Sequence, residues 1–302
     1  MALAAGVVLS SCGASAGPVA PAPPPGPKPI QEAVSNQAAP VQTAPIQTVV
    51  GGIKYVGKLT QGGWLRGVAP SGTRSVTLDG APLALAPDGT FFAAFDRDAP
   101  PSLQLAVTGA DGFGLALPLT IAPRSWRIES INVAKRPGAM PDAAFRERRA
   151  AELAQIGAAR AKGSDGGGWR QSMIWPAAGR ISGVFGAQRI YRGEPGAYHA
   201  GVDLAAPASA PIVAPADGVV VLAAAEPFTL EGHLLIVDHG MGLASAFLHC
   251  SDLVVHLGDS VVQGQLLGHV GMTGRATGPH LHWALTWHGR RLDPQLFAPA
   301  VR

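Results

Sequence analysis

The sequence predicts a mainly β protein made of an N-terminal β-sandwich-like domain, a helical connector and a C-terminal antiparallel β domain. Three observations support this fold class. The 302 residues include 39 glycines and 27 prolines, a composition that favours turn-rich β structure over a helical bundle. Short segments of alternating apolar and polar residues, broken by Gly, Pro and Asp-Gly turns, fill both halves of the chain. One segment only, just before the middle of the chain, has a convincing helical pattern.

The charge content argues against a nucleic-acid partner. Lys and Arg together number 23 and Asp and Glu 20, which gives a net charge of +3 in a chain with only 14% charged residues. Nucleic-acid binders usually gather many Lys and Arg residues on one face. The chain also has no apolar run long enough for a transmembrane helix.

The first 12 residues are typical of a secretion signal. Residues 2–9 are apolar but too short to span a membrane. The following Leu9-Ser10-Ser11-Cys12 resembles the lipobox of bacterial lipoproteins, which implies a lipid anchor at Cys12 and a periplasmic location in a Gram-negative envelope. An ordinary cleaved signal, or a start that contains Cys by chance, is the alternative. Residues 13–50, rich in Pro, Ala and Gln, are expected to form a disordered tether.

Residues 51–134 are expected to form the β-sandwich-like domain. Asp79-Gly80 and Asp88-Gly89 lie between alternating apolar segments, which is a strong hairpin signal. No cluster in this domain carries chemistry, so it is a spacer or a module that binds the wall or a partner. Its aromatic residues are expected to pack in the core: Trp64, Phe91, Phe92 and Phe95.

Residues 135–168 are expected to form the helical connector and a Gly-rich joint. Asp142 can cap the start of a helix that Gly163 ends, and SDGGGW at 164–169 is typical of a flexible joint. The helix either packs on one domain as a connector or lies across the cleft of the domain that follows.

The histidines are the most informative feature, because all nine lie after residue 198. His280 and His282 have the same parity in a strand and therefore face the same side. His199 and Asp203 also share parity, and Gly201 between them leaves room for a close approach. Two imidazoles and a carboxylate are a ligand set that suits Zn²⁺ and leaves a fourth position for water. A further imidazole could serve as general base or stabilise an oxyanion.

These residues belong to a longer pattern. HAGVDLAAP, PADGVV, VDHG, FLHCSDL, TGRATGPHLHWAL and RLDP follow one another in the order found in lysostaphin/LytM-type zinc metallopeptidases, which the segment from about residue 175 to residue 294 resembles. The resemblance implies an antiparallel β peptidase domain over 169–302 with one zinc ion per chain. His199, Asp203 and His282 would be the zinc ligands, and His249 and His280 the catalytic imidazoles, either of which could take the proton.

The same resemblance implies a zinc endopeptidase that hydrolyses peptide cross-links of peptidoglycan in the cell envelope. The alternative is a non-catalytic regulator of the same fold that binds and activates cell-wall amidases or other hydrolases. Degenerate members lack site residues, whereas all five are present here, which favours the enzyme. Of the remaining candidates, His239 is expected to be structural and Cys250 to be a small buried residue. Cys250 is not expected to bind zinc, because its parity in the strand opposes that of His249.

Overall fold

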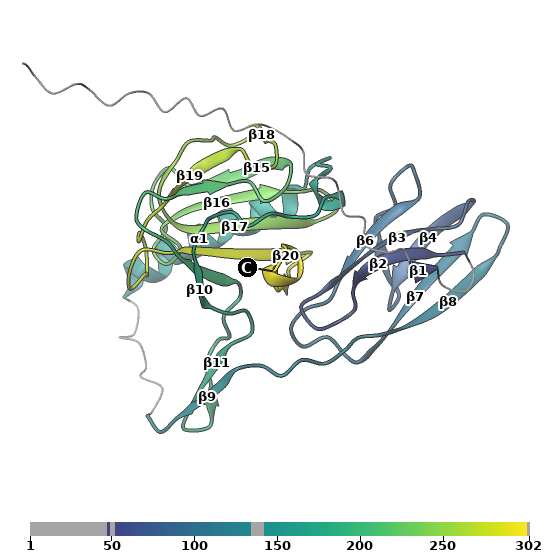
Figure 1. Ribbon diagram of the computed structural model, residues 1–302, viewed down its shortest axis with the longest axis horizontal. Coiled ribbons are helices and arrows are strands. Elements are labelled where there is room, and N and C mark those ends of the chain that lie inside the picture. The colour runs from purple at the N-terminus through teal and green to yellow at the C-terminus, as the bar shows by residue number, and fades with distance from the viewer. Residues whose placement is uncertain (1–46, 49–51, 134–141, 301–302) are drawn as a thin grey trace, which may run out of the picture. The chain divides into compact units, whose positions relative to one another are not determined.

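The computed structural model describes residues 47–48, 52–133 and 142–300, all within one compact unit of the chain, Val41–Arg302. Within these ranges the structure is mainly antiparallel β with one α-helix, which confirms the predicted fold class (Figure 1). The predicted lipobox around Cys12 and most of the predicted tether lie outside the described residues. None of the helices in the described ranges is long and apolar enough to cross a bilayer.

Two four-stranded antiparallel sheets form the N-terminal part. The first joins β1 (Gln47–Thr48), β2 (Lys54–Lys58), β3 (Trp64–Val68) and β6 (Thr90–Ala94), and the second joins β5 (Ala81–Leu83), β4 (Thr73–Leu78), β7 (Ser102–Gly109) and β8 (Gly114–Thr120). Asp79 and Gly80 both have positive φ angles, as a tight two-residue hairpin between β4 and β5 requires. Phe91, Phe92 and Phe95 are buried, as predicted.

Strand β9 (Ile128–Ile131) leaves this part of the chain. The sequence assigned residues 51–134 to one domain, but β9 pairs in parallel with β11 (Gln188–Tyr191), which also pairs with β12 (Glu194–Pro195). No local pattern signals this pairing, because parallel strands have no hairpin turn between them. The strand therefore extends the C-terminal part of the molecule.

The C-terminal part is built on one large sheet. Its main path runs in the order β10 (Arg180–Gly183), β13 (Val202–Ala205), β20 (Leu281–Trp287), β17 (Leu243–Leu253), β16 (His233–Asp238), β15 (Gly218–Ala223) and β18 (Ser260–Val261). β19 (Leu266–Val270) pairs with β17 and with β14 (Pro211–Val213), and β21 (Arg290–Leu292) pairs with β20. The short helix η2 (Pro294–Leu296) follows.

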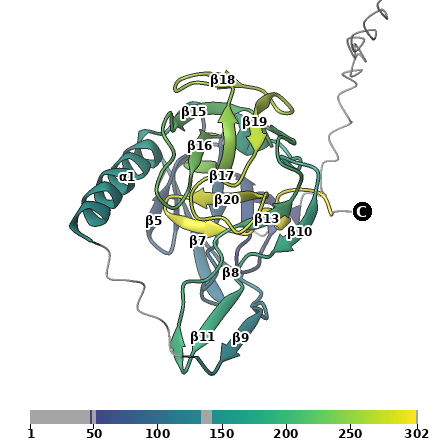
Figure 2. The ribbon, with the colours of Figure 1, turned by 90° about the vertical axis from the view of Figure 1, so that its left-hand side faces the viewer.

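Helix α1 (Ala143–Lys162) packs on one face of this sheet. Its bounds match the prediction, since the Asp142 side chain accepts a hydrogen bond from the Phe145 N–H and Gly163 ends the helix. Ile156 and Ala159 join a hydrophobic cluster with residues of β15, β16 and β17, and Figure 2 shows α1 beside β15 and β16. The helix is thus a connector packed on the sheet rather than a segment lying across a cleft.

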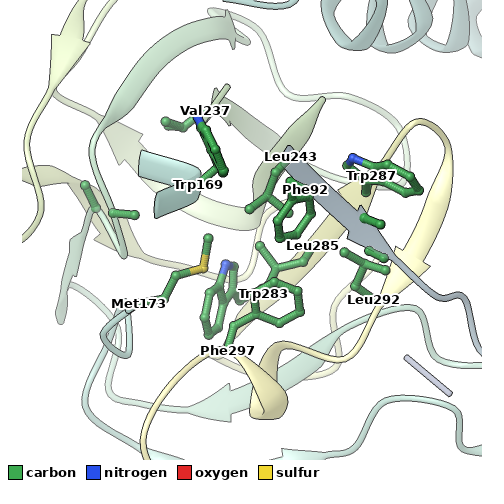
Figure 3. Close-up of a cluster of buried hydrophobic side chains, with 14 of the residues drawn as sticks. Phe92, Trp169, Met173, Val237, Leu243, Trp283, Leu285, Trp287, Leu292 and Phe297 are labelled. Carbon is green, nitrogen blue, oxygen red and sulfur yellow. The ribbon is translucent and has the colours of Figure 1, made fainter. Parts of the chain in front are cut away.

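The two parts share one hydrophobic core. Phe92 of β6 packs edge-on against Trp169 and Trp287, with ring centroids 6.4 and 6.1 Å apart, respectively (Figure 3). Phe92 comes from the N-terminal sheets, whereas Trp169 lies on η1 (Gly168–Arg170) and Trp287 ends β20. The N-terminal part is therefore packed against the C-terminal part through a buried aromatic contact.

The segment 164–169, expected to be a flexible joint, is packed against the turn after β16. The Ser164 hydroxyl donates to Asp238 over 2.6 Å and the Trp169 N–H donates to the His239 carbonyl over 2.9 Å. A Cβ at Gly168 would lie 1.9 Å from the Asp217 carbonyl oxygen. Gly166 and Gly168 thus permit close packing of the backbone against residues 217 and 239–240, whereas a Cβ at Gly167 would meet nothing within 4 Å.

Candidate metal centre

The pairing of β13 with β20 brings three of the predicted site residues together. Asp203 lies directly opposite His282 in this antiparallel pair, so both side chains face the same side of the sheet. His199 lies four residues before Asp203, in the loop that leads into β13. Gly201 is needed between them, because a Cβ there would lie 2.8 Å from Nε2 of His282.

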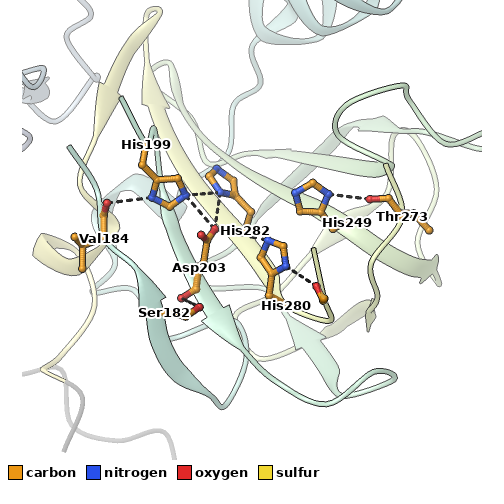
Figure 4. Close-up of polar contacts among 9 residues, drawn as sticks. Ser182, Val184, His199, Asp203, His249, Thr273, His280 and His282 are labelled. Carbon is orange, nitrogen blue, oxygen red and sulfur yellow. Dashed lines mark hydrogen bonds and ion pairs between the residues drawn. The ribbon is translucent and has the colours of Figure 1, made fainter. Parts of the chain in front are cut away.

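The three ligand atoms converge on one point (Figure 4). Asp203 Oδ1 lies 3.0 Å from His199 Nε2 and 2.9 Å from His282 Nδ1, and the two nitrogens are 3.1 Å apart. Tetrahedral Zn²⁺ with bonds of about 2.0–2.1 Å would hold such atoms about 3.3 Å apart. The residues present therefore fit a zinc ion with little rearrangement, and within the described ranges they are the one such group of His, Cys, Asp and Glu.

Hydrogen bonds fix which nitrogen of His199 faces this point. The ring Nδ1 lies 3.0 Å from the Val184 carbonyl oxygen, which can only accept, so Nδ1 carries the proton and Nε2 presents its lone pair. Burial opposes charge on both Asp203 and His199. The contacts of Asp203 with His199 and His282 outweigh burial and hold the pKa of its carboxyl well below its usual range, while Asp203 and the Val184 carbonyl together raise the pKa of His199. The Asp203 carboxylate therefore stays ionised and attracts a cation.

A bulge in β17 delivers His249 to the same face. Leu248 lies opposite His282, so strict alternation would point the next side chain away from the site. His249 instead has φ +65°, and the register against β16 shifts between Leu235 and His233. A non-glycine residue in this conformation at a bulge is a strained arrangement of the kind found at functional sites.

His249 and His280 form a second pair of imidazoles beside the three-residue group. Their ring centroids are 4.8 Å apart, and Nε2 of His280 lies 3.8 Å from Asp203 Oδ1. His249 donates through Nδ1 to the Thr273 carbonyl over 2.9 Å, and His280 does so to the Gly278 carbonyl over 2.9 Å. Each ring therefore keeps Nε2 without a proton, and burial lowers the pKa of His249 so that it stays neutral near pH 7.

A groove of about 1170 Å³ opens beside this centre. One wall includes His199, Asp203 and Tyr198 from the loop and strand of the centre itself. Another comes from the β9 segment, whose lining residues carry no motif that marks them in the sequence as site residues: Arg127, Glu129, Ile131 and Val133. The missed residues precede the resembling segment in the sequence, and only the parallel pairing with β11 places them here.

The structure brings all five predicted site residues into one cluster and leaves the other candidates outside it. His239 is fully buried and donates through Nδ1 to the Asp217 carbonyl, while its Nε2 accepts from the Ser245 hydroxyl, so it is structural as predicted. Cys250 is buried, and burial raises the pKa of its thiol to about 12, which disfavours the thiolate that metal binding requires.

Comparison with known families and proteins gives a consistent result. Peptidase family M23 matches residues 197–294. The peptidoglycan DD-endopeptidase ShyA of Vibrio cholerae is 38% identical over 118 residues, which are 38% of this chain and 26% of that protein. The DD-carboxypeptidase/endopeptidase Mpg of Neisseria meningitidis is 35% identical over 119 residues, again 38% of this chain and 26% of that protein. The chain thus matches about a quarter of the length of these relatives.

A crystal structure from Pseudomonas aeruginosa, labelled a peptidase M23, has a similar fold. It superposes with a TM-score of 0.61 at 29% sequence identity and covers 81% of this chain and 96% of its own. The matching region covers 81% of this chain, which is far more than residues 197–294. The structural similarity therefore includes part of the N-terminal sheets.

Proposed function

We propose that this chain is a zinc-dependent endopeptidase that hydrolyses peptide cross-links of peptidoglycan, on the premise that residues 197–294 match peptidase family M23. The observation that carries the proposal is the cluster of five side chains. Three converge as metal ligands, and two further imidazoles present Nε2 next to them. The Vibrio and Neisseria relatives, a peptidoglycan DD-endopeptidase and a DD-carboxypeptidase/endopeptidase, support peptidoglycan as the substrate.

His199, Asp203 and His282 would hold the ion. Bound there, zinc would act as a Lewis acid on the scissile carbonyl and lower the pKa of a water molecule towards 7. The hydrogen bond from His199 Nδ1 to the Val184 carbonyl oxygen keeps the ring in the tautomer that zinc binding requires.

His249 and His280 supply the proton transfers. Each has its Nδ1 proton held by a carbonyl oxygen, so its Nε2 is free to accept a proton from the attacking water. The ring that has accepted this proton can then donate it to the leaving amine nitrogen. The low pKa of His249 favours the neutral, proton-accepting form at neutral pH, and peptide hydrolysis proceeds without a covalent enzyme intermediate.

We also propose a location in the cell envelope, where this substrate lies. The resemblance of Leu9–Cys12 to a lipobox supports a lipid anchor at Cys12. Detergent phase partitioning of the protein expressed in a Gram-negative host tests it. We expect the chain in the detergent phase and its Cys12→Ser variant in the aqueous phase, and equal partitioning would contradict the anchor.

The test of the enzymatic proposal is digestion of purified, cross-linked peptidoglycan by the zinc-loaded full chain, read by mass spectrometry of the muropeptides. We expect cross-linked dimers to fall and monomers to rise, and the masses to identify the cleaved bond. His280→Ala removes a proton-transfer group and is expected to abolish the change. His256→Ala is the matched control, because that ring is 88% exposed and lies in the loop between β17 and β18, outside the group of five side chains.

The opposite result would favour the non-catalytic regulator. If the full chain binds zinc but leaves every cross-link intact, the enzymatic proposal is wrong. Cleavage that His280→Ala leaves unchanged would instead show that the activity does not come from this centre.

A further inference from the structure

Arg97 reaches from the N-terminal sheets to the loop that holds the metal ligand His199. It follows β6 and is only 7% exposed. Its Nε donates to the Gly186 carbonyl over 3.2 Å, and its Nη2 donates to Gln188 Oε1 over 3.1 Å. Its Nη1 donates to Asp98 over 2.8 Å.

The buried guanidinium also lies against two aromatic rings. Its carbon is 4.8 Å from the Tyr198 ring centroid and 5.2 Å from that of Trp126. Burying a charge is costly unless it is paired and hydrogen-bonded, and here three hydrogen bonds and two aromatic rings offset that cost. Lysine cannot reproduce this arrangement, because it lacks the planar fork with several donors.

The turn that Arg97 contacts makes three hydrogen bonds with His199. The Gly186 N–H donates to the His199 carbonyl over 2.9 Å, and the His199 N–H donates to the Ala187 carbonyl over 2.8 Å. The third is the bond from the ring Nδ1 to the Val184 carbonyl over 3.0 Å. The backbone and the ring of His199 are therefore both positioned by residues 184–187.

Packing fixes this turn against the N-terminal part as well. Gly186 has φ +79°, and a Cβ there would lie 2.2 Å from Trp126, so the turn is seated directly on that ring. Trp126 in turn packs edge-on against Phe185, with ring centroids 5.7 Å apart. The turn thus has Trp126 on one side, Arg97 at its carbonyl and His199 on the other side.

We propose that Arg97 is a positioning residue for the metal ligand His199, so that the N-terminal part of the chain completes the metal centre. The proposal rests on the metal site of the proposed function. Arg97 touches neither metal nor substrate, and acts by holding the turn whose carbonyl fixes the orientation of the His199 ring. Such outer-shell partners typically change metal affinity about 10- to 100-fold, and since Arg97 acts one bond further out, we expect about 10-fold.

The test measures zinc affinity of the metal-free full chain by competition with a chromogenic chelator, together with the absorption spectrum of the Co²⁺ form. Arg97→Met is expected to weaken zinc binding about 10-fold and to alter the Co²⁺ spectrum, which reports ligand geometry. Arg97→Lys keeps a buried positive charge and is expected to restore part of the affinity. Arg74→Met, on the exposed side of β4, is the matched control and should stay within about twofold of the unsubstituted chain.

Arg97→Lys keeps the test decisive if Arg97→Met fails to fold. Affinity within twofold of the unsubstituted chain and an unchanged Co²⁺ spectrum in Arg97→Lys would overturn the proposal, whatever happens to thermal stability. A general loss of stability, by contrast, would lower the unfolding temperature without changing the Co²⁺ spectrum. If the unsubstituted chain itself binds no zinc, the metal site of the proposed function is wrong and this inference falls with it.

Discussion

Phe92→Ala should destabilise the whole described unit. Phe92 is 2% exposed and packs edge-on against Trp169 and Trp287, which both lie across the contact from the N-terminal sheets. Truncating a buried phenylalanine typically costs about 3–5 kcal/mol, and the two aromatic contacts place this site in the upper half of that range. For a unit of this size each kcal/mol lowers the unfolding temperature by about 2–4 °C, so a fall of about 8–20 °C is expected.

Thermal unfolding followed by circular dichroism measures this shift. Because the core is shared, the two parts should unfold together in one transition that moves as a whole. Phe113→Ala is the control, since that ring is 43% exposed and its loss should move the transition by no more than about 2 °C. A shift of less than about 4 °C, or two transitions of which only one moves, would refute the shared core.

Two further predictions concern buried polar groups. Burial lowers the pKa of His239 below 6.5, so as the pH falls through 6.5 the unfolded chain takes up a proton that the folded chain does not, and stability falls by up to about 1.4 kcal/mol per pH unit. In urea unfolding, His239→Asn should have a lower free energy of unfolding than the unsubstituted chain at pH 7.5, and the difference between the two should be smaller at pH 5.5. A difference that is the same at both pH values would contradict this. Arg149 donates two hydrogen bonds to Glu231, over 2.6 and 2.8 Å, and both side chains are 17% exposed. A double-mutant cycle on this pair should give a coupling free energy of about 1–2 kcal/mol. The exposed Arg189–Glu129 pair is the control and should show no measurable coupling free energy. Equal coupling free energies for the two pairs would refute the role of burial.

Strand parity predicted which neighbouring side chains share a face, because that geometry is local: it paired His199 with Asp203 and His280 with His282. The bounds of α1 were predictable for the same reason, since Asp142 and Gly163 act within one helical turn. Each of these predictions depends on residues close together in the chain or on the strict period of a strand. The choice of His199, Asp203 and His282 as the expected zinc ligands came from the resemblance to a known family.

Features that depend on distant segments could not be predicted. The bulge that points His249 toward the site is defined by the pairing of β17 with β16, where the register shifts. Strict alternation along β17 would place His249 on the opposite face of the sheet. The groove residues Arg127 and Glu129 lie before the resembling segment, and their place follows from the parallel pairing of β9 with β11. Arg97 has no motif at all, because its role depends on partners 89 and 91 residues away.

The most direct test of the account is a stoichiometric zinc titration of the metal-free full chain, with cleavage of cross-linked peptidoglycan measured at each step. We expect the activity to rise linearly with added zinc and to stop rising at one zinc ion per chain. The reason is that the described residues offer a single group of metal ligands, His199, Asp203 and His282. In His282→Ala the same titration should give no activity at one equivalent. Full activity in metal-free protein, or activity in His282→Ala equal to that of the unsubstituted chain, would contradict the central claim.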